Sequence, residues 1–275
     1  MTTTEDAIVT RAVSRDGTEI GYWTTGEGPP LVLVHGMSAD HTRWDALRPH
    51  LEPHVTVHAL DRRGRGASDD GSDYAIEHEY EDVAAVVDAV AETAGSAVAV
   101  YGHSSGGVYA FGAARLTSNL GRLVCYEGWP TVDPAPFLAP AELVARLEEL
   151  LAQDDREAVV EAVARELAHM TDDEIAAYRA QPSWPARVAA AHTIPREART
   201  LRALTLDPAQ AGSVTAPTLL LVGGDSPAWK SEAQALAATL PDARVAVLGG
   251  QGHAADALAP ELVAETILPF LRQPH

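Results

Sequence analysis

The chain has 275 residues, 46% of them apolar, and its 39 acidic and 20 basic side chains give a net charge of -19 with histidine neutral. This length suits one large α/β domain with an insertion, and the negative charge repels nucleic-acid backbones and anionic lipid surfaces. We therefore expect a small-molecule partner and neither nucleic-acid binding nor a membrane role, while no sequence feature predicts an oligomeric state.

Cysteine content and the N-terminal segment bear on the compartment. Cys125 is the single cysteine, so neither an intrachain disulfide nor a cysteine zinc site can form. The first ten residues contain Glu5 and Asp6 and lack the basic start and apolar stretch of a secretory signal. No stretch approaches the roughly 20 apolar residues that span a bilayer. These features predict a cytoplasmic protein.

Short apolar runs alternate with helical patterns along much of the chain, which is typical of βαβ units that build a parallel sheet. Residues 7–14 and 19–24 flank the turn Asp16-Gly17 and predict an antiparallel hairpin at the sheet edge. Continuous apolar runs, typical of strands covered on both faces, follow at residues 31–34, 55–60, 97–101, 123–126, 218–222 and 244–248. Together these runs predict a mostly parallel sheet of about eight strands flanked by helices.

Two regions have helical periodicity. Residues 77–94 place apolar side chains on one face and stop at Gly95, which predicts a crossover helix. Residues 130–212 contain no strand-like run and show successive amphipathic helices, one of them opened by a capping box from Thr171 to Glu174. We therefore predict a helical cap at 130–212, inserted into an α/β core formed by residues 1–129 and 213–275.

The segment Gly102-His103-Ser104-Ser105-Gly106 matches the pattern Gly-x-Ser-x-Gly. It directly follows the predicted strand 97–101 and precedes a helical stretch at 107–117, which is the strand, sharp turn and helix that this motif requires. The turn would expose the Ser104 hydroxyl above the sheet, with a helix N-terminus behind it that favours negative charge. Ser104 is therefore the candidate nucleophile.

A serine hydroxyl needs a base within hydrogen-bond reach. His253 is the best candidate, because it ends the glycine-rich loop 249–253 after the last predicted strand. Acyl transfer also needs backbone donors for the oxyanion. We assign them to the amide of Ser105, at the helix start, and to the amide of Met37, in the loop after strand 31–34.

These motifs resemble the α/β-hydrolase family. The resemblance rests on His35-Gly36, on the loop 61–68, on the Ser104 elbow and on the late Gly-His pair, which stand in the order of that family. It implies an acid between the nucleophile and the histidine in the chain, and a variable helical cap after strand six. It also implies that the loop 61–68 is structural and borders the site.

Two residues compete for the role of the acid. Most members of the family carry it after strand seven, three residues beyond a glycine, but Asp225 follows Gly223 by only two residues. Glu127 ends strand six, where some members, including the zearalenone-type lactone hydrolases, carry the acid. We favour Glu127 and keep Asp225 as the alternative, which separate alanine substitutions would distinguish.

The substrate pocket is expected to include Gly36 and His103, beside the predicted site, and two tryptophans. Trp129 follows strand six, and we expect it to line the pocket. Trp184 lies in the predicted cap, where it could equally well anchor the cap to the core.

We predict a serine-dependent hydrolase that cleaves an ester or lactone of a small, mainly apolar, uncharged substrate through an acyl-enzyme, without metal or cofactor. The alternatives are a carbon-carbon bond hydrolase or other cofactor-free chemistry on this fold, or a ligand-binding receptor with a slow triad. Activity of the hydrolase should fall in acid, because only neutral imidazole acts as a base.

Overall fold

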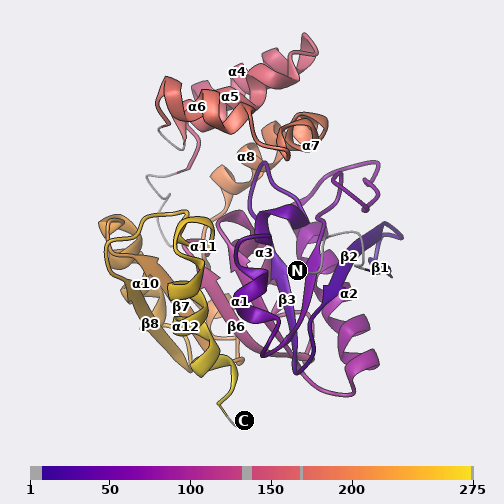
Figure 1. Cartoon of the computed structure of the whole chain (residues 1–275), viewed down its shortest axis with the longest axis vertical. Helices are drawn as coiled ribbons and strands as arrows, with labels where there is room; N and C mark the ends of the chain where they lie inside the picture. Colours follow the sequence, from indigo (N-terminus) through magenta and orange to yellow (C-terminus); the bar gives the residue numbers. More distant parts are fainter. Residues whose placement is uncertain (1–7, 132–137, 168–169, 274–275) are drawn as a thin grey trace.

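An eight-stranded sheet forms the centre of the molecule in the computed structural model, which describes residues 8–131, 138–167 and 170–273 (Figure 1). The strands are β1 (Ile8–Val13), β2 (Glu19–Thr25), β3 (Pro30–Val34), β4 (Thr56–Leu60), β5 (Val98–His103), β6 (Leu120–Tyr126), β7 (Thr218–Gly223) and β8 (Ala243–Leu248). Their order across the sheet is β1-β2-β4-β3-β5-β6-β7-β8. The pairs β1·β2 and β2·β4 are antiparallel and all others are parallel. This topology confirms the predicted mostly parallel sheet and its edge hairpin.

Helices cover both faces of the sheet because successive strand residues point to opposite sides. In β3, Val32 and Val34 join one apolar cluster, whereas Leu31 and Leu33 join the other. The first cluster includes side chains from α2 (Ile76–Ala94), α3 (Ser105–Ala113) and α10 (Pro227–Ala237). The second includes side chains from η2 (His41–Trp44), α1 (Arg48–Leu51), α11 (Ala255–Leu258) and α12 (Pro260–Leu271). Helix α2 ends at Gly95, whose φ of 65° is left-handed, as predicted.

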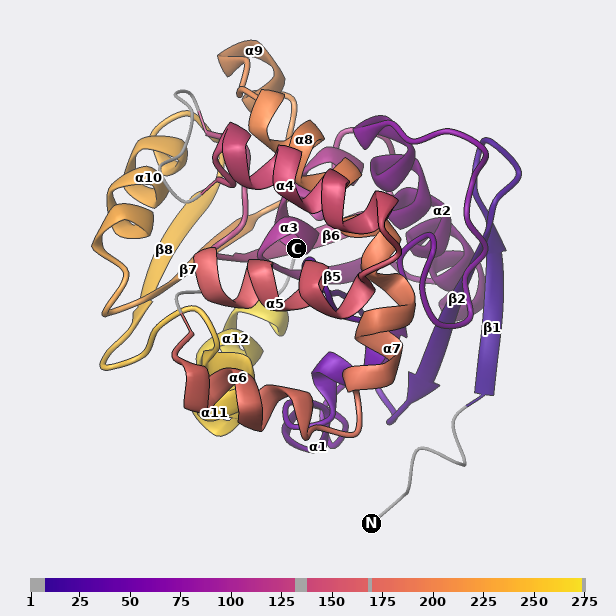
Figure 2. The same cartoon turned by 90° about the horizontal axis from the view of Figure 1, so that it is seen from above.

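A helical segment lies between β6 and β7 in the chain. It contains α4 (Ala141–Ala152), α5 (Arg156–Glu166), α6 (Asp172–Arg179), α7 (Trp184–Ala189), η3 (Ala190–Thr193) and α8 (Ile194–Ala203), followed by α9 (Pro208–Ala211). We call α4 to α8 the inserted helices. Seen from above, α4, α5 and α7 lie across the sheet (Figure 2). They have an apolar cluster of their own, which includes Leu147, Val160 and Ile194.

The capping box at the start of α6 is present, with Thr171 and Glu174 each bonding the backbone of the other. The division into a core and a cap at residues 130 and 212 stays a prediction. Parts of the predicted N-terminal strand and of the predicted cap, residues 1–7, 132–137 and 168–169, lie outside the described residues. Among the helices in the described ranges, none is long and apolar enough to cross a membrane.

Candidate active site

Ser104 occupies the sharp turn between β5 and α3. Its φ of 55° is left-handed, a conformation that side chains other than glycine rarely adopt. The glycines on either side make the turn possible. A Cβ at Gly102 would lie 2.5 Å from the Gly106 carbonyl oxygen, and a Cβ at Gly106 would lie 2.2 Å from the Val34 carbonyl oxygen. The strained turn therefore holds a partly exposed serine at the carboxyl end of β5.

Glu127 and His253 are in direct contact. Nδ1 of His253 lies 2.7 Å from Oε2 of Glu127, and the Gly223 N–H donates to Oε1 at 2.8 Å. The Glu127 side chain is fully buried, whereas that of His253 is 47% exposed. Because a carboxylate only accepts hydrogen bonds, the shared proton sits on Nδ1, so the lone pair of the neutral ring is on Nε2. The imidazole is thereby held in the tautomer that a general base needs.

Glu127 lies close to the serine turn because the end of β6 packs against it. The Ser104 N–H donates to the Tyr126 carbonyl at 2.9 Å. A Cβ at Gly128 would lie 1.7 Å from the Ser104 carbonyl oxygen, so only glycine fits there. Glu127 itself has a φ of 43°. The backbone therefore turns sharply at Glu127, and the chain leaves the line of β6 beside Ser104.

Asp225 is exposed, in contrast to Glu127. Its backbone N–H donates to the Gln251 carbonyl at 3.0 Å, and no hydrogen bond or ion pair of its side chain occurs within the described ranges. The structure thus brings Glu127, and not Asp225, to the ring of His253. The roles of both residues in catalysis stay predictions.

The loop after β3 packs directly on the serine. A Cβ at Gly36 would lie 2.9 Å from the Ser104 Cβ and 3.4 Å from its Oγ. Next in the chain is Met37, whose N–H has no acceptor in the part of the chain that the structure describes, and the same holds for the N–H of Ser105 at the start of α3. Both N–H groups are thus without a partner among the described residues, as donors kept for an oxyanion would be, and their role as oxyanion donors stays a prediction.

The model of the family described as "Alpha/beta hydrolase family" matches residues 31–266. The chain belongs to this family. A solved α/β hydrolase from Sphaerobacter thermophilus is 37% identical and superposes with a TM-score of 0.81, covering 95% of this chain and 100% of that one. A thermophilic esterase from Thermogutta terrifontis is 25% identical with a TM-score of 0.69, covering 97% and 98% of the two chains.

Among curated relatives of this α/β hydrolase, the 2-(acetamidomethylene)succinate hydrolase of Mesorhizobium japonicum is 27% identical, over 97% of this chain and 96% of the relative. The pimeloyl-[acyl-carrier protein] methyl ester esterase of Vibrio campbellii is 31% identical, over 49% of this chain and 52% of the relative. The relatives are therefore named as hydrolases and esterases, and this chain is itself a hydrolase of the family.

His103 of this α/β hydrolase contacts the backbone of the histidine loop. Its Nε2 lies 2.8 Å from the His253 carbonyl oxygen, so Nε2 carries a proton and donates. Nδ1 faces the buried Asp256 at 4.0 Å, and Asp256 also pairs with Arg43. Burial, and then the charge of Arg43, lower the pKa of His103 well below its usual range, so its ring is neutral. The observed contact anchors the loop, and the predicted contact with substrate stays a prediction.

Aromatic rings stand beside His253 in this hydrolase. Trp229 on α10 is nearly parallel to the imidazole, with ring centroids 6.3 Å apart and planes inclined by 13°. Trp129 is buried and meets Trp229 edge-on at 4.9 Å. Sequence reasoning named Trp129 but missed Trp229, because a tryptophan in an amphipathic helix gives no sign of the neighbour it faces.

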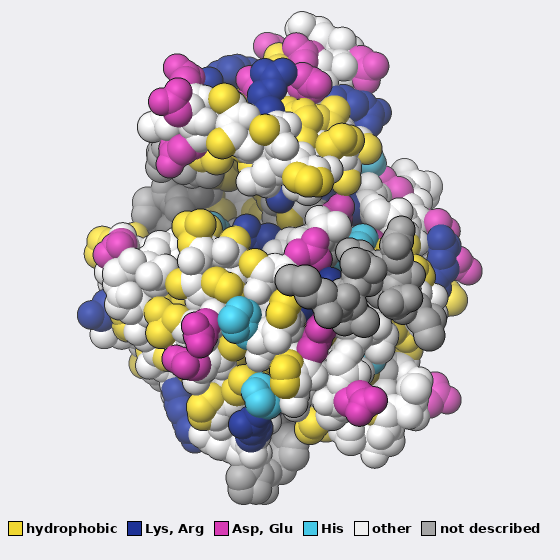
Figure 3. Space-filling model, in the orientation of Figure 1, with side chains coloured by type: hydrophobic (Ala, Val, Ile, Leu, Met, Phe, Trp, Pro, Cys, Tyr) yellow, Lys and Arg dark blue, Asp and Glu magenta, His cyan; other side chains and the backbone are white. Residues whose placement is uncertain are grey.

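The inserted helices reach the serine site at the loop after β3. Arg187 on α7 donates to the Ser38 carbonyl, and Met37 packs against the apolar clusters of both the sheet and the inserted helices. Trp184 packs within the cluster of the inserted helices, edge-on to Tyr178 at 5.7 Å. Figure 3 shows the surface hollowed between the inserted helices and the rest of the molecule. Within the described residues, no three His, Cys, Asp or Glu side chains converge as a metal site would require.

Proposed function

We propose that this α/β hydrolase is a serine esterase or lactonase that works through an acyl-enzyme. The observation that carries the proposal is the contact between Glu127 and His253, because Glu127 follows the end of β6 that packs against the left-handed turn of Ser104. This arrangement supplies a nucleophile, a base in the required tautomer and a group that orients the base.

In the proposed reaction, Ser104 Oγ attacks the carbonyl carbon of the ester while Nε2 of His253 takes the hydroxyl proton. Glu127 accepts the Nδ1–H bond throughout and stabilises the imidazolium that forms. The amides of Met37 and Ser105 bind the oxyanion of the tetrahedral intermediate. The imidazolium then protonates the departing alcohol, and a water molecule, activated by the same histidine, releases the acid and frees Ser104.

The proposed substrate is a small ester or lactone with a mainly apolar, uncharged body. The net charge of -19 disfavours anions, and Trp229 places an apolar surface beside the base. The proposed cap, residues 130–212, would enclose this substrate against the serine. A relative from Vibrio campbellii named as a methyl ester esterase supports the choice of bond.

Hydrolysis of short p-nitrophenyl esters and small lactones by the purified protein tests this proposal. We expect a burst of p-nitrophenol followed by steady turnover, and loss of both in Ser104→Ala. Equal turnover by the Ser104→Ala variant would overturn the proposal. Tight ligand binding without turnover would favour a ligand-binding receptor. Cleavage of a carbon-carbon bond without esterase activity would favour a carbon-carbon bond hydrolase.

A further inference from the structure

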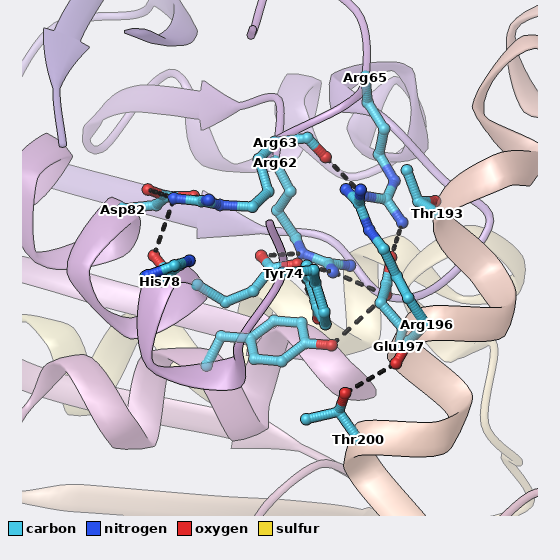
Figure 4. A network of polar contacts seen from close by, with 12 residues as sticks. Arg62, Arg63, Arg65, Tyr74, His78, Asp82, Thr193, Arg196, Glu197 and Thr200 are labelled. Carbon is cyan, nitrogen blue, oxygen red and sulfur yellow. Dashed lines mark hydrogen bonds and ion pairs between the residues drawn. The ribbon is translucent and has the colours of Figure 1, made fainter. Parts of the chain in front are cut away.

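Arg62, in the loop after β4, is a fully buried arginine held by two carboxylates from different parts of the fold. Its Nε and Nη2 donate to Glu79 of α2 at 2.9 and 2.6 Å, and Nη2 also pairs with Glu197 of α8 at 2.7 Å. The guanidinium lies 4.2 Å from the centre of the Tyr109 ring on α3. Arg65 pairs with the same Glu197, and Figure 4 shows both arginines directed at it. Two arginines and two carboxylates thus form a buried, charge-balanced cluster.

The remaining donor of Arg62 reaches the loop beside the serine. Nη1 donates to the Gly36 carbonyl at 3.2 Å, and His35 Nδ1 lies 2.9 Å from the same oxygen. The Arg62 backbone N–H donates to His35 Nε2 at 3.2 Å, so His35 is the Nδ1–H tautomer. Burial, followed by the charges of Arg62 and Arg65, lowers the pKa of His35 well below its usual range, which keeps this tautomer neutral. The Gly36 carbonyl oxygen therefore accepts two hydrogen bonds, one from Arg62 and one from His35.

That carbonyl belongs to the same peptide group as the Met37 N–H. A trans peptide is planar, so its C=O and N–H lie on opposite edges. Holding the Gly36 carbonyl on the side of Arg62 therefore turns the Met37 N–H to the other side. Gly36 packs on Ser104, and the Met37 N–H has no acceptor within the described residues.

We propose that Arg62 and His35 are positioning residues that fix the Gly36–Met37 peptide and so aim the Met37 N–H at the oxyanion. The direction of the Met37 N–H then depends on the position of α8, because Glu197 of α8 is one of the two carboxylates that hold Arg62. The inference rests on the proposed function, in which the Met37 amide binds the oxyanion.

The charge balance of the cluster explains why α8 matters. Burial alone would raise the pKa of Glu197, but Arg62 and Arg65 lower it to about 2, so the carboxylate stays ionised. If α8 moved away, Arg65 would lose the carboxylate with which it pairs and Arg62 would keep only Glu79, and buried charge without a partner is costly. The oxyanion donor is therefore well aimed only while the inserted helices are docked.

The substitution Arg62→Lys tests the proposal, because a single ammonium cannot bridge both carboxylates and the Gly36 carbonyl. Arg63→Lys is the matched control. Arg63 is equally buried in the same loop and pairs with Asp82 of α2 at 2.7 Å through both Nε and Nη2, but it makes no contact with Gly36. Both variants should lose similar thermal stability.

We expect Arg62→Lys to lower kcat for p-nitrophenyl esters by about 100- to 1000-fold, the usual effect of losing one oxyanion donor, with KM changed by less than about threefold. The affinity for phenylboronic acid, which forms a tetrahedral serine adduct, should fall with kcat. Arg63→Lys should retain both quantities within about threefold. Equal losses of kcat in the two variants, or a change confined to KM, would overturn the proposal.

A second variant keeps the test valid if Arg62→Lys does not fold. Glu197→Gln keeps the shape of the side chain and removes its charge, and we expect kcat to fall by about tenfold or more at nearly constant KM. Glu166→Gln, at an exposed ion pair of the inserted helices, is its control. Unchanged kcat in Glu197→Gln would contradict the link to α8. The proposed function fails separately, if Ser104→Ala hydrolyses esters as well as the wild type.

Discussion

Oε2 of Glu127 lies 2.7 Å from Nδ1 of His253, and it reaches the imidazole from the end of β6. The other carboxylate oxygen is held by the N–H of Gly223 at the end of β7, the strand on which most members of the family carry the acid. The neighbouring strand thus supplies a backbone donor in place of a carboxylate. The same donor fixes the orientation of Glu127, and through it the ring of His253.

Replacement of Glu127 distinguishes the two candidate acids. Glu127→Gln keeps the size of the side chain but loses the charge that stabilises the imidazolium, so kcat should fall by about 10³- to 10⁴-fold. Asp225→Ala should keep kcat within about threefold of the wild type, because its side chain is exposed and does not contact His253. Steady-state kinetics with p-nitrophenyl acetate give both values. A large loss in Asp225→Ala with none in Glu127→Gln would make Asp225 the acid.

Gly36→Ala should damage activity more than folding. The added methyl would lie 2.9 Å from the Ser104 Cβ, so the loop or the serine must shift by several tenths of an ångström. We expect kcat/KM to fall by about tenfold or more, since catalysis depends on sub-ångström placement of the reacting groups. Gly249→Ala is the control, because its methyl would meet no atom within 4 Å. Similar kinetics for the two variants would contradict the contact between Gly36 and Ser104.

The stability of the fold should decline in acid partly through His103. Burial and Arg43 keep its pKa in the folded state well below the 6.5 of the unfolded state. Above pH 6.5 neither state binds the proton, whereas below it only the unfolded state does, so unfolding becomes easier by up to about 1.4 kcal/mol per pH unit.

His103→Gln removes that contribution while retaining a donor for the His253 carbonyl. Between pH 7 and pH 5.5, urea denaturation should therefore show the wild type losing about 1 to 2 kcal/mol more unfolding free energy than the variant. Parallel losses in the two proteins would show that His103 takes up a proton in the folded state.

The rate of ester hydrolysis should also fall in acid, for a different reason. Protonation of His253 occupies Nε2, and the imidazole can then no longer accept the proton of Ser104. We expect kcat/KM to fall as the pH is lowered, measured where the fold is intact by circular dichroism. A rate that stays flat down to pH 4 would argue against His253 as the base.

Much of the architecture follows from the sequence because its signals are local. Strand runs such as residues 31–34 are apolar at every position, and Gly95 ends α2 as a left-handed residue should. The glycines around Ser104 likewise indicate a tight turn, in which larger residues would not fit. These features depend on neighbours in the chain, and periodicity and motif order are enough to find them.

Contacts between distant segments explain what sequence reasoning left open or missed. The choice of Glu127 over Asp225 as the partner of His253 depends on the φ of 43° at Glu127 and on a backbone donor 96 residues later. The cluster around Arg62 joins a loop to α2 and α8, and charged residues in a loop are normally solvated. The loop 61–68 could be named as a border of the site, but its contact with the Gly36 carbonyl had no signal in the sequence.

Labelling with a fluorophosphonate probe tests the central claim most directly, because the reaction needs an activated serine and no knowledge of the substrate. Intact-mass analysis and peptide mapping should show a single adduct on Ser104, absent in Ser104→Ala and formed much more slowly in Glu127→Gln. No adduct on the folded wild-type protein, or an adduct on another serine that persists in Ser104→Ala, would contradict the assignment of Ser104 as the nucleophile.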